Sequence, residues 1–303
     1  MDNNESKFMF IHQADWQKRL LLRYGSELVL MDATCKTTKY SIPLFFICVH
    51  TNVGYKVVAE FLCHNEEKEY IAEVLIILRS WNLTWDPKYF MVDYSTAEIN
   101  AIANQFLNVS VYICDFHREQ PWQRCAKASK NGLTVGEQAL FLEIMQQIAH
   151  AWNVESYGKS VESLRKSKLD TGNPNVADYC EKVWLNCSER WSHAFHVQQA
   201  VNIINTNNGI EAQNKVSKYS YLLSSLDKSV FGIVVMIVES FVPDSYQQNH
   251  NTNLQNSSSY RKYKNNIPEY LHNRPMHFVQ HSLKSKFPVC ELKESVVKKE
   301  SSS

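Results

Sequence analysis

Three apolar stretches near the N-terminus decide the fold: GSELVLMDAT at 25–34, IPLFFICVHT at 42–51 and GYKVVAEFLC at 54–63. Each is rich in Val, Ile, Leu or Phe and is bounded by turn-forming residues, so each predicts a β-strand. The turn TNVG at 51–54 joins the second stretch to the third. Connections this short favour an antiparallel meander, whose first strand we expect to end at Asp32.

A helix and a fourth strand follow the meander. Apolar residues at helical spacing predict a helix from Glu66 to about Trp81. Pro87 then closes a loop, and KYFMVD at 88–93 predicts a fourth strand that ends at Asp93.

The next helix and strand complete the pattern. Ser95 is suited to cap a helix, and Glu98 three residues later completes a capping box. NVSVYICDF at 108–116 predicts a fifth strand. The order strand-strand-strand-helix-strand-helix-strand is that of the RNase H-like fold, an α/β class with a mixed sheet and flanking helices.

Residues 121–204 predict an all-helical insertion into this core, because they lack a convincing strand pattern. We expect helices at Gly136–Trp152, Val154–Lys168 and Ala177–Trp191, with a shorter helix after His193. Aromatic residues in helices are usually core residues, so four tryptophans are expected to pack inside the insertion: Trp122, Trp152, Trp184 and Trp191.

The last third of the chain returns to the core and then becomes polar. A helix carrying Glu211 follows TNNG, and an apolar helix from Ser229 to about Ser240 is expected to stop at Pro243. The polar segment 249–266 predicts a loop, and Met276–Lys286 predicts a last helix. The expected division is a disordered or partial flank at 1–15, core at 16–120, helical insertion at 121–204, core at 205–250 and a basic flank with a disordered tail at 251–303.

Composition limits the classes of function. The net charge is only +1, which argues against a wholly basic nucleic-acid binder. Residues 251–303 carry nine Lys or Arg and four Asp or Glu, so this flank either contacts phosphates or is a solvated tail. The most apolar stretch, Val230–Val238, is about half the roughly 18 residues that a membrane helix needs. The first eight residues, MDNNESKF, do not resemble a secretory signal.

The eight cysteines are scattered, and some, such as Cys48 and Cys114, lie in apolar runs. This distribution favours reduced thiols in a cytosolic or nuclear protein over a disulfide framework. No C-x-x-C pair is present, so the sequence does not support a zinc site within the chain.

Two aspartates at strand ends are the first candidates for chemistry. Asp32 follows LVLM and Asp93 follows YFMV, so adjacent strands would bring both carboxylates to one edge of a sheet. Carboxylate oxygens are the ligands that Mg²⁺ prefers, although acidic residues also commonly end strands. Glu211 is a candidate third carboxylate, and Glu98 and Glu239 are its rivals on position alone.

The chain resembles the transposases of Mutator-like elements, the MULE superfamily. The resemblance includes RYGSELVLMDATCKTTKYSIPLFF (23–46), WNLTWDPKYFMVDYSTAEINAI (81–102) and VYICDFHREQPWQR (111–124). It continues in TNNGIEAQNKVSKYSYL (206–222), and also in TNVGYKVVAEF (51–61), KSVFGIVVMIVESFVPDSYQ (228–247) and YLHNRPMHFVQHSLKSKF (270–287). These matches cover most of the chain in the order that the family has.

The resemblance implies catalytic and metal-binding roles for three residues. The D-A-T-x-K-T segment contains Asp32, the F-M-V-D-Y-S-x-A-E segment contains Asp93, and the T-N-N-x-x-E segment contains Glu211. It also implies two Mg²⁺ or Mn²⁺ ions, and DNA cleavage and strand transfer. The family's C-x2-H motif corresponds to Cys114 and His117, which are open to metal, DNA-phosphate or structural roles.

The implied partner is double-stranded DNA, at element ends and at the target, in the nucleus. Four basic residues are candidates for phosphate contacts, with solvated surface charge as the alternative: Lys36, Lys39, Arg118 and Arg124. A homodimer or a higher oligomer is the assembly considered, and no membrane partner is expected.

Departures from the family leave a second function open. Longer relatives carry a C-terminal SWIM-type zinc finger with a C-x-C…C-x-H pattern, whereas near its end this sequence has only one cysteine, Cys290 in FPVCELKE. The expectation is therefore a truncated copy or a fragment without its end-recognition module. The alternative function is a domesticated or truncated nuclear DNA-binding or regulatory protein without strand transfer.

Overall fold

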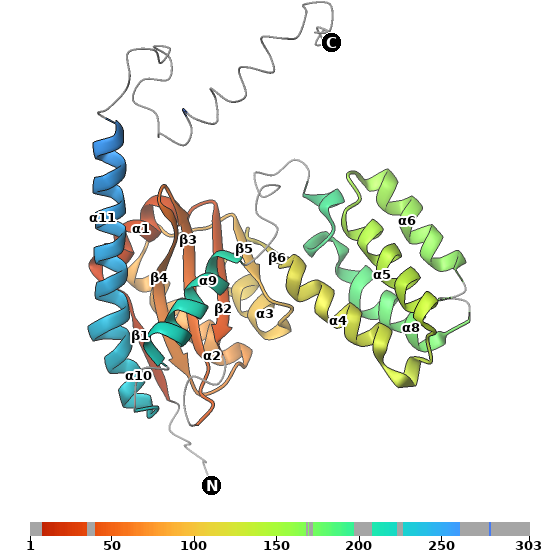
Figure 1. Cartoon of the computed structure of the whole chain (residues 1–303), viewed down its shortest axis with the longest axis horizontal. Helices are drawn as coiled ribbons and strands as arrows, with labels where there is room; N and C mark the ends of the chain where they lie inside the picture. The colour runs from red at the N-terminus through yellow and green to blue at the C-terminus, as the bar shows by residue number, and fades with distance from the viewer. Residues whose placement is uncertain are drawn as a thin grey trace, which may run out of the picture. The chain divides into compact units, whose positions relative to one another are not determined.

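A six-stranded mixed sheet forms the centre of the first of two compact units, Met1–Val242 (Figure 1). The structure is a computed structural model. It describes residues 8–34, 40–167, 169, 172–196, 208–222, 227–260 and 279. The second unit begins at Pro243.

The strands of the sheet are β1 (Met9–His12), β2 (Leu28–Thr34), β3 (Leu44–Thr51), β4 (Gly54–Cys63), β5 (Tyr89–Val92) and β6 (Ser110–Ile113). Their order in the sheet is β1-β4-β3-β2-β5-β6. Antiparallel pairing joins β1 to β4, β4 to β3 and β3 to β2, whereas β5 and β6 extend the sheet in parallel from β2. The predicted meander and the mixed α/β, RNase H-like sheet are thus confirmed.

The sheet has one strand more than the sequence predicts. Residues 9–12, expected within a disordered or partial flank, form the edge strand β1 and pair with β4 from Cys63 to Glu60. Nδ1 of His12 lies 2.5 Å from Oε1 of the fully buried Glu60, and Gln17 donates to the other oxygen at 2.9 Å. These polar contacts, which a four-residue run does not reveal, attach the N-terminal segment to the sheet.

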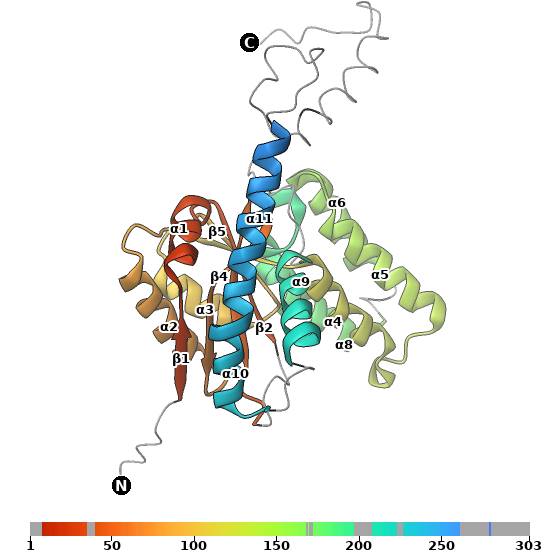
Figure 2. The same ribbon diagram turned by 60° about the vertical axis from the view of Figure 1, so that its left-hand side comes forward.

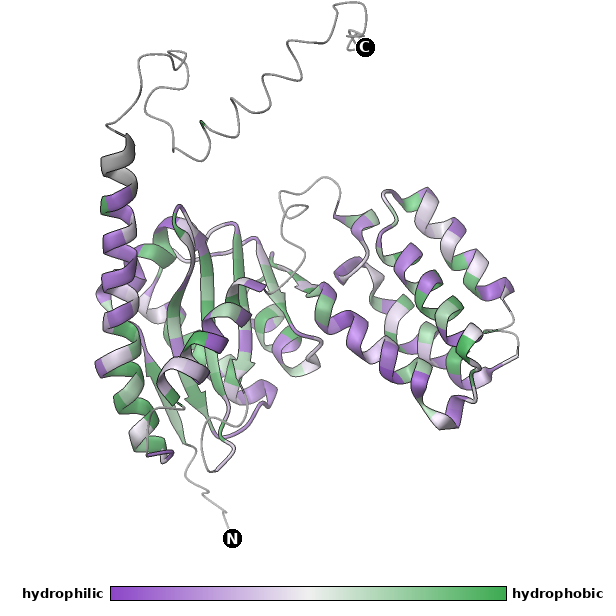
Figure 3. Cartoon of the chain, viewed as in Figure 1, coloured by the Kyte–Doolittle hydropathy of each residue, from purple (hydrophilic) through white to green (hydrophobic). Residues whose placement is uncertain are grey.

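Helices cover both faces of the sheet (Figures 1 and 2). One face packs against α1 (Asp15–Tyr24), α2 (Lys68–Trp81) and α3 (Thr96–Gln105). The other packs against α9 (Asn208–Val216) and α10 (Val230–Met236). Because both faces are covered, the central strands are continuous apolar runs, as Figure 3 shows by their colour.

From α4 (Asp115–Lys127) to residue 196 the described residues form helices and no strand, and α4 starts before the insertion boundary predicted at residue 121. The single helix predicted at 177–191 is divided among three shorter helical elements. Three of its four tryptophans are fully buried and in mutual edge-to-face contact, whereas Trp152 is 73% exposed, so its predicted core position is wrong. The elements after α4 are η1 (Ser129–Asn131), α5 (Val135–Ala149), α6 (Val154–Lys166), α8 (Pro174–Tyr179), η2 (Cys180–Trp184), η3 (Leu185–Arg190) and η4 (His193–Phe195).

Helix α9 leads into η6 (Ser217–Leu222), and α10 continues without interruption through η7 (Ile237–Phe241) into α11 (Val242–Tyr260). The predicted stop at Pro243 and the loop predicted from residue 249 are therefore wrong as far as Tyr260. Pro243 is the second residue of α11, and the π-helical turn η7 precedes it. A π turn changes the hydrogen-bond register before the proline, which lets the chain continue. The helix predicted at 276–286 lies outside the described residues except for Val279.

The run Val230–Gln255 is long and apolar enough to cross a membrane by length and composition alone, a possibility that the sequence did not predict. Within α10 and η7, however, Ile233, Met236, Ile237 and Phe241 are buried in the cluster beneath α9 and α10. Packing against the sheet therefore accounts for these four apolar residues, whereas Phe231 and Val238 of the same part are exposed.

Candidate active site

Asp32 points to the sheet face that carries α9. Side chains alternate along a strand, and Leu30, two residues earlier, belongs to the cluster on that face. The strand continues to Thr34, so Asp32 lies inside β2 instead of ending it. Its side chain is almost fully buried, and Nδ2 of Asn214 donates a 2.8 Å hydrogen bond to its Oδ2.

Asp93 joins Asp32 because their strands are neighbours. β2 and β5 pair in parallel, and Asp93 directly follows the last residue of β5. The two carboxyl groups share a side-chain hydrogen bond. The sequence expectation that adjacent strands bring these aspartates to one place is confirmed.

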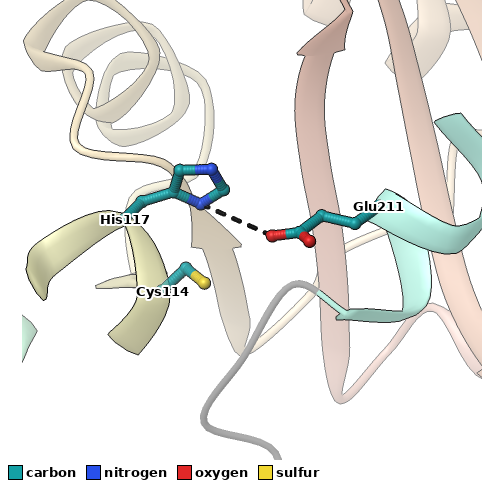
Figure 4. A group of neighbouring side chains, drawn as sticks. All are labelled: Cys114, His117 and Glu211. Atoms are coloured by element: carbon teal, nitrogen blue, oxygen red, sulfur yellow. Dashed lines mark ion pairs between the residues drawn. The ribbon is translucent and has the colours of Figure 1, made fainter. Parts of the chain in front are cut away.

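Glu211 reaches the same place from α9, on the far side of the helical insertion. Nδ1 of His117 lies 2.7 Å from Oδ1 of Asp93 and 3.9 Å from Oε1 of Glu211. Figure 4 shows His117 and Glu211 facing each other from the two elements. The structure therefore brings together the three carboxylates that the sequence singles out.

Cys114 and His117 lie at the start of α4, where Cys114 is the N-cap residue. Sγ of Cys114, an imidazole nitrogen of His117 and a carboxylate oxygen of Glu211 all lie within 4.8 Å of one another (Figure 4). The two residues of the C-x2-H motif also share a hydrogen bond. The geometry is compatible both with a metal-binding role and with an orienting role for His117.

The acidic groups perturb one another. Burial, together with the neighbouring charge of Asp93, raises the pKa of Asp32 to about 8, although His117 opposes this shift. Burial acts to lower the pKa of His117, but hydrogen bonds to Asp93 and Cys114 outweigh it and raise that pKa to about 10. His117 lies between the carboxylates of Asp93 and Glu211, which favour its protonated form.

The two rivals for the third carboxylate have different environments. Glu239 is exposed on η7. Glu98 is buried, and burial together with the charges of Asp93 and Asp32 raises its pKa well above its usual range. Its backbone nitrogen donates to Ser95 as predicted, but its side chain is buried beside the aspartates and is not part of a complete capping box.

Close packing seats α9 on the sheet. Gly209 approaches Tyr55 so closely that a Cβ at this position would overlap the ring. Gln213 donates to the carbonyl oxygen of Tyr55 at 3.2 Å, and Ile210 is fully buried. Sequence reasoning missed Gly209 and Asn214, although Asn214 lies one helical turn after Glu211 and thus on the same helix face.

The helical insertion contacts the loop that carries Asp93. The next residue, Tyr94, stacks on Trp184 with ring centroids 4.6 Å apart. Trp184 in turn packs against Trp122 and Trp191. The tryptophan cluster thus supports the residue that follows the second aspartate.

Two of the four candidates for phosphate contacts can be compared in the structure, and they differ in the exposure of their side chains. Lys36 and Lys39 lie outside the described residues. Arg118 has no exposed side-chain surface and binds Asp115 and the carbonyl oxygen of Trp191, each at 2.7 Å, so its prediction as a phosphate contact is wrong. Arg124 is exposed on α4 and remains available.

The residues present fit a hard divalent cation. Asp32, Asp93 and Glu211 supply carboxylate oxygens, which are the donors that Mg²⁺ and Mn²⁺ take. Oε1 of Glu211 is buried without a hydrogen-bond partner among the described residues. The raised pKa of Asp32 reflects negative charge that a cation in this place would neutralise.

A comparison with known protein families supports the RNase H-like fold of the sheet. Residues 1–112 match the family described as the RNase H-like domain of zinc finger SWIM domain-containing protein 1/3. The match includes Asp32 and Asp93 and ends within β6, before Cys114. No curated protein matches the chain. Together, the match and the mixed sheet establish an RNase H-like fold, related to that of the SWIM proteins.

Proposed function

We propose that this chain is the catalytic core of a DDE-type DNA transposase of the MULE superfamily. The observation that carries the proposal is the convergence of Asp32, Asp93 and Glu211 around His117. Three acidic residues from separate segments repel one another when they are brought together, and one of them, Asp32, is also buried. Divalent cations bound between the three carboxylates would offset this repulsion.

In this proposal, the three carboxylates bind two Mg²⁺ or Mn²⁺ ions. Such ions, when bound, activate an attacking hydroxyl group and stabilise the departing oxygen of a phosphodiester. Asn214 orients Asp32 through its hydrogen bond, and His117 orients Asp93 through its ion pair. The protein's contribution is positioning and charge, with no covalent intermediate.

The proposed partner is double-stranded DNA, and the proposed location is the nucleus. Arg124 lies on the exposed side of α4 and lines a pocket of about 490 Å³ with Lys127. Two adjacent cations on an exposed surface suit contacts with a phosphate backbone. A homodimer or a higher oligomer remains the proposed assembly, because strand transfer involves two element ends.

The test is nicking of supercoiled plasmid DNA with Mg²⁺ or Mn²⁺. Wild type is expected to nick the plasmid, and Asp93→Asn and Glu211→Gln are expected to reduce nicking to background. Glu239→Gln is the matched control, because it removes an exposed carboxylate from a helix outside the site. Equal nicking by Asp93→Asn and wild type would remove Asp93 from the proposed site.

The second candidate is a nuclear DNA-binding or regulatory protein without strand transfer. One observation favours it: the matched family is named for zinc finger SWIM proteins and not for a transposase. A gel-shift assay with the same DNA distinguishes the two. DNA binding without nicking, unchanged in Asp93→Asn, would favour this second function.

A further inference from the structure

A second group of possible metal ligands lies outside the carboxylate site. Asp115 is the first residue of α4, His150 is the C-cap residue of α5, and His193 is the first residue of η4. One ligand atom from each lies within 4.8 Å of the others. Three elements of the chain thus present two imidazoles and a carboxylate to one point.

The carboxylate of Asp115 is already oriented. Its Oδ1 accepts a 2.7 Å contact from Nη1 of the buried Arg118. Its Oδ2 lies 3.4 Å from Nε2 of His193. Arg118 therefore fixes one oxygen and leaves the other directed at the histidines.

His193 has a polar atom that the described residues do not satisfy. Its Nε2 is buried and has no hydrogen-bond partner among them, although the Oδ2 atom of Asp115 is near. A buried nitrogen without a partner is costly, and such atoms often mark an ion or a water molecule. A metal ion between His193 and Asp115 would satisfy both.

His150 supplies the third ligand. Its ring lies 4.8 Å from that of His193, with an angle of 80° between the two ring planes. One of its ring nitrogens lies within 4.8 Å of the ligand atoms of Asp115 and His193.

We propose that Asp115, His150 and His193 bind a Zn²⁺ ion, with water as the fourth ligand. Zinc with three protein ligands and an open position commonly uses histidine and carboxylate. Bond lengths of about 2.0–2.2 Å place tetrahedral ligand atoms about 3.3–3.6 Å apart. The observed 3.4 Å between Asp115 and His193 fits this spacing, and the ligand atom of His150 lies within 4.8 Å of both.

Zinc at this point would join α4, α5 and η4. Asp115 lies between Cys114 and His117, so the ion would also fix the first turn of α4 beside the carboxylate site. No short motif reveals these ligands in the sequence, because each comes from a different element. The proposal does not depend on the proposed nuclease activity.

The experiment is a Co²⁺ titration of the Glu211→Gln chain, followed by visible absorption, with Zn²⁺ as competitor. Glu211→Gln is nearly isosteric and is expected to weaken metal binding both at the proposed carboxylate site and at the neighbouring group of Cys114, His117 and Glu211. One equivalent of Co²⁺ is expected to bind without a thiolate charge-transfer band. Adding His150→Gln is expected to weaken this binding more than about 100-fold, beyond the usual effect of an outer-shell change.

The matched control is His64→Gln, which changes an exposed histidine outside this cluster and is expected to bind like the parent. His150 is exposed, so its variant is expected to fold; far-UV circular dichroism checks this, and His193→Gln provides a second ligand variant. Parental binding in both His150→Gln and His193→Gln would overturn the proposal. A cobalt spectrum dominated by thiolate charge transfer, or no binding at all, would also overturn it.

Discussion

Nδ2 of Asn214 on α9 donates a 2.8 Å hydrogen bond to Oδ2 of Asp32 on β2. This bond joins the first strand of the predicted meander to a helix that follows the whole insertion. It fixes the rotamer of a buried aspartate and the position of Glu211, one turn earlier on the same helix face. The two halves of the RNase H-like core therefore meet directly at the candidate site.

Asn214→Ala is expected to destabilise the fold by about 1–3 kcal/mol, because it leaves a buried carboxyl oxygen without its donor. Divalent cations should also bind more weakly, since Asp32 and α9 lose a common constraint. Urea unfolding and calorimetric Mn²⁺ titration measure the two effects. Lys215→Ala, at the next and exposed position of α9, is the control and should change neither quantity.

Gly209→Ala is expected to displace α9, because the new Cβ would overlap the ring of Tyr55. Lower stability and weaker Mn²⁺ binding should follow. Gly158→Ala on α6 is the matched control: a Cβ added there would meet no heavy atom within 4 Å, and removing a helix-interior glycine should stabilise by about 0.5–1 kcal/mol.

A second substitution separates the clash from other effects of Gly209→Ala. Tyr55→Ser removes the ring that the Cβ would meet. The double variant should therefore be more stable than the sum of the single changes predicts. Strict additivity in urea unfolding would contradict the proposed contact.

Metal affinity is expected to depend on pH because Asp32 must lose a proton to bind a cation. Its pKa is raised to about 8, so below that value each pH unit should weaken Mn²⁺ binding about tenfold, with a plateau above it. Calorimetric titration at pH 6, 7 and 8 measures this slope. An affinity that is constant over this range would contradict it.

The variant His117→Asn tests the predicted pH dependence of metal binding in a second way. The charge of His117 lowers the pKa of Asp32, so its removal should move the midpoint of the metal-binding curve to higher pH. The raised pKa of His117 itself, about 10, has a separate consequence. Its contribution to stability is complete below about pH 6.5 and is lost as the pH rises through 10.

Arg118 and Arg124, both phosphate candidates from the sequence, are expected to behave differently. Arg118→Met leaves Asp115 without its buried partner and removes the cation beside Trp122 and Trp191. Removing one partner of a buried ion pair costs about 3–5 kcal/mol, and the partial exposure of Asp115 should reduce this. Arg124→Met should leave the urea midpoint unchanged and weaken DNA binding. Weaker DNA binding by Arg118→Met at unchanged stability, together with a lower urea midpoint for Arg124→Met, would contradict the structural role of Arg118 and the DNA-binding role of Arg124.

The sequence predicted the strands well because their patterns are local. The apolar runs at β2, β3 and β4 and the short turn at 51–54 determine which strands pair. The position of Asp93 at the end of β5 followed in the same way. These features need no information from distant segments.

Long-range packing explains what the sequence did not reveal. The edge strand β1 depends on its contacts with β4, including the pair formed by His12 and Glu60. Continuation of the helix through Pro243 depends on the π turn before it. Burial of Arg118 depends on the tryptophans around it, which a pattern of charges cannot show.

At the candidate site, too, local sequence patterns predicted one part and long-range packing determined the rest. Sequence position alone left three possible third carboxylates, Glu98, Glu211 and Glu239, and could not rank them. The resemblance pointed to Glu211, and the structure places that residue beside His117. It also buries Glu98 nearby and leaves Glu239 exposed, a distinction that only tertiary packing can make.

The buried Trp184 and the exposed Trp152 are expected to contribute very differently to the stability of the fold. Trp184 is fully buried and contacts Tyr94, Trp122 and Trp191, whereas Trp152 is 73% exposed. Trp184→Ala is expected to cost about 3–5 kcal/mol, and Trp152→Ala should lie within about 0.5 kcal/mol of wild type. Because Tyr94 follows Asp93, Trp184→Phe, which keeps an aromatic ring, should preserve more Mn²⁺ affinity than Trp184→Ala does. Equal unfolding midpoints for Trp184→Ala and Trp152→Ala would show that the tryptophan cluster does not support this part of the fold.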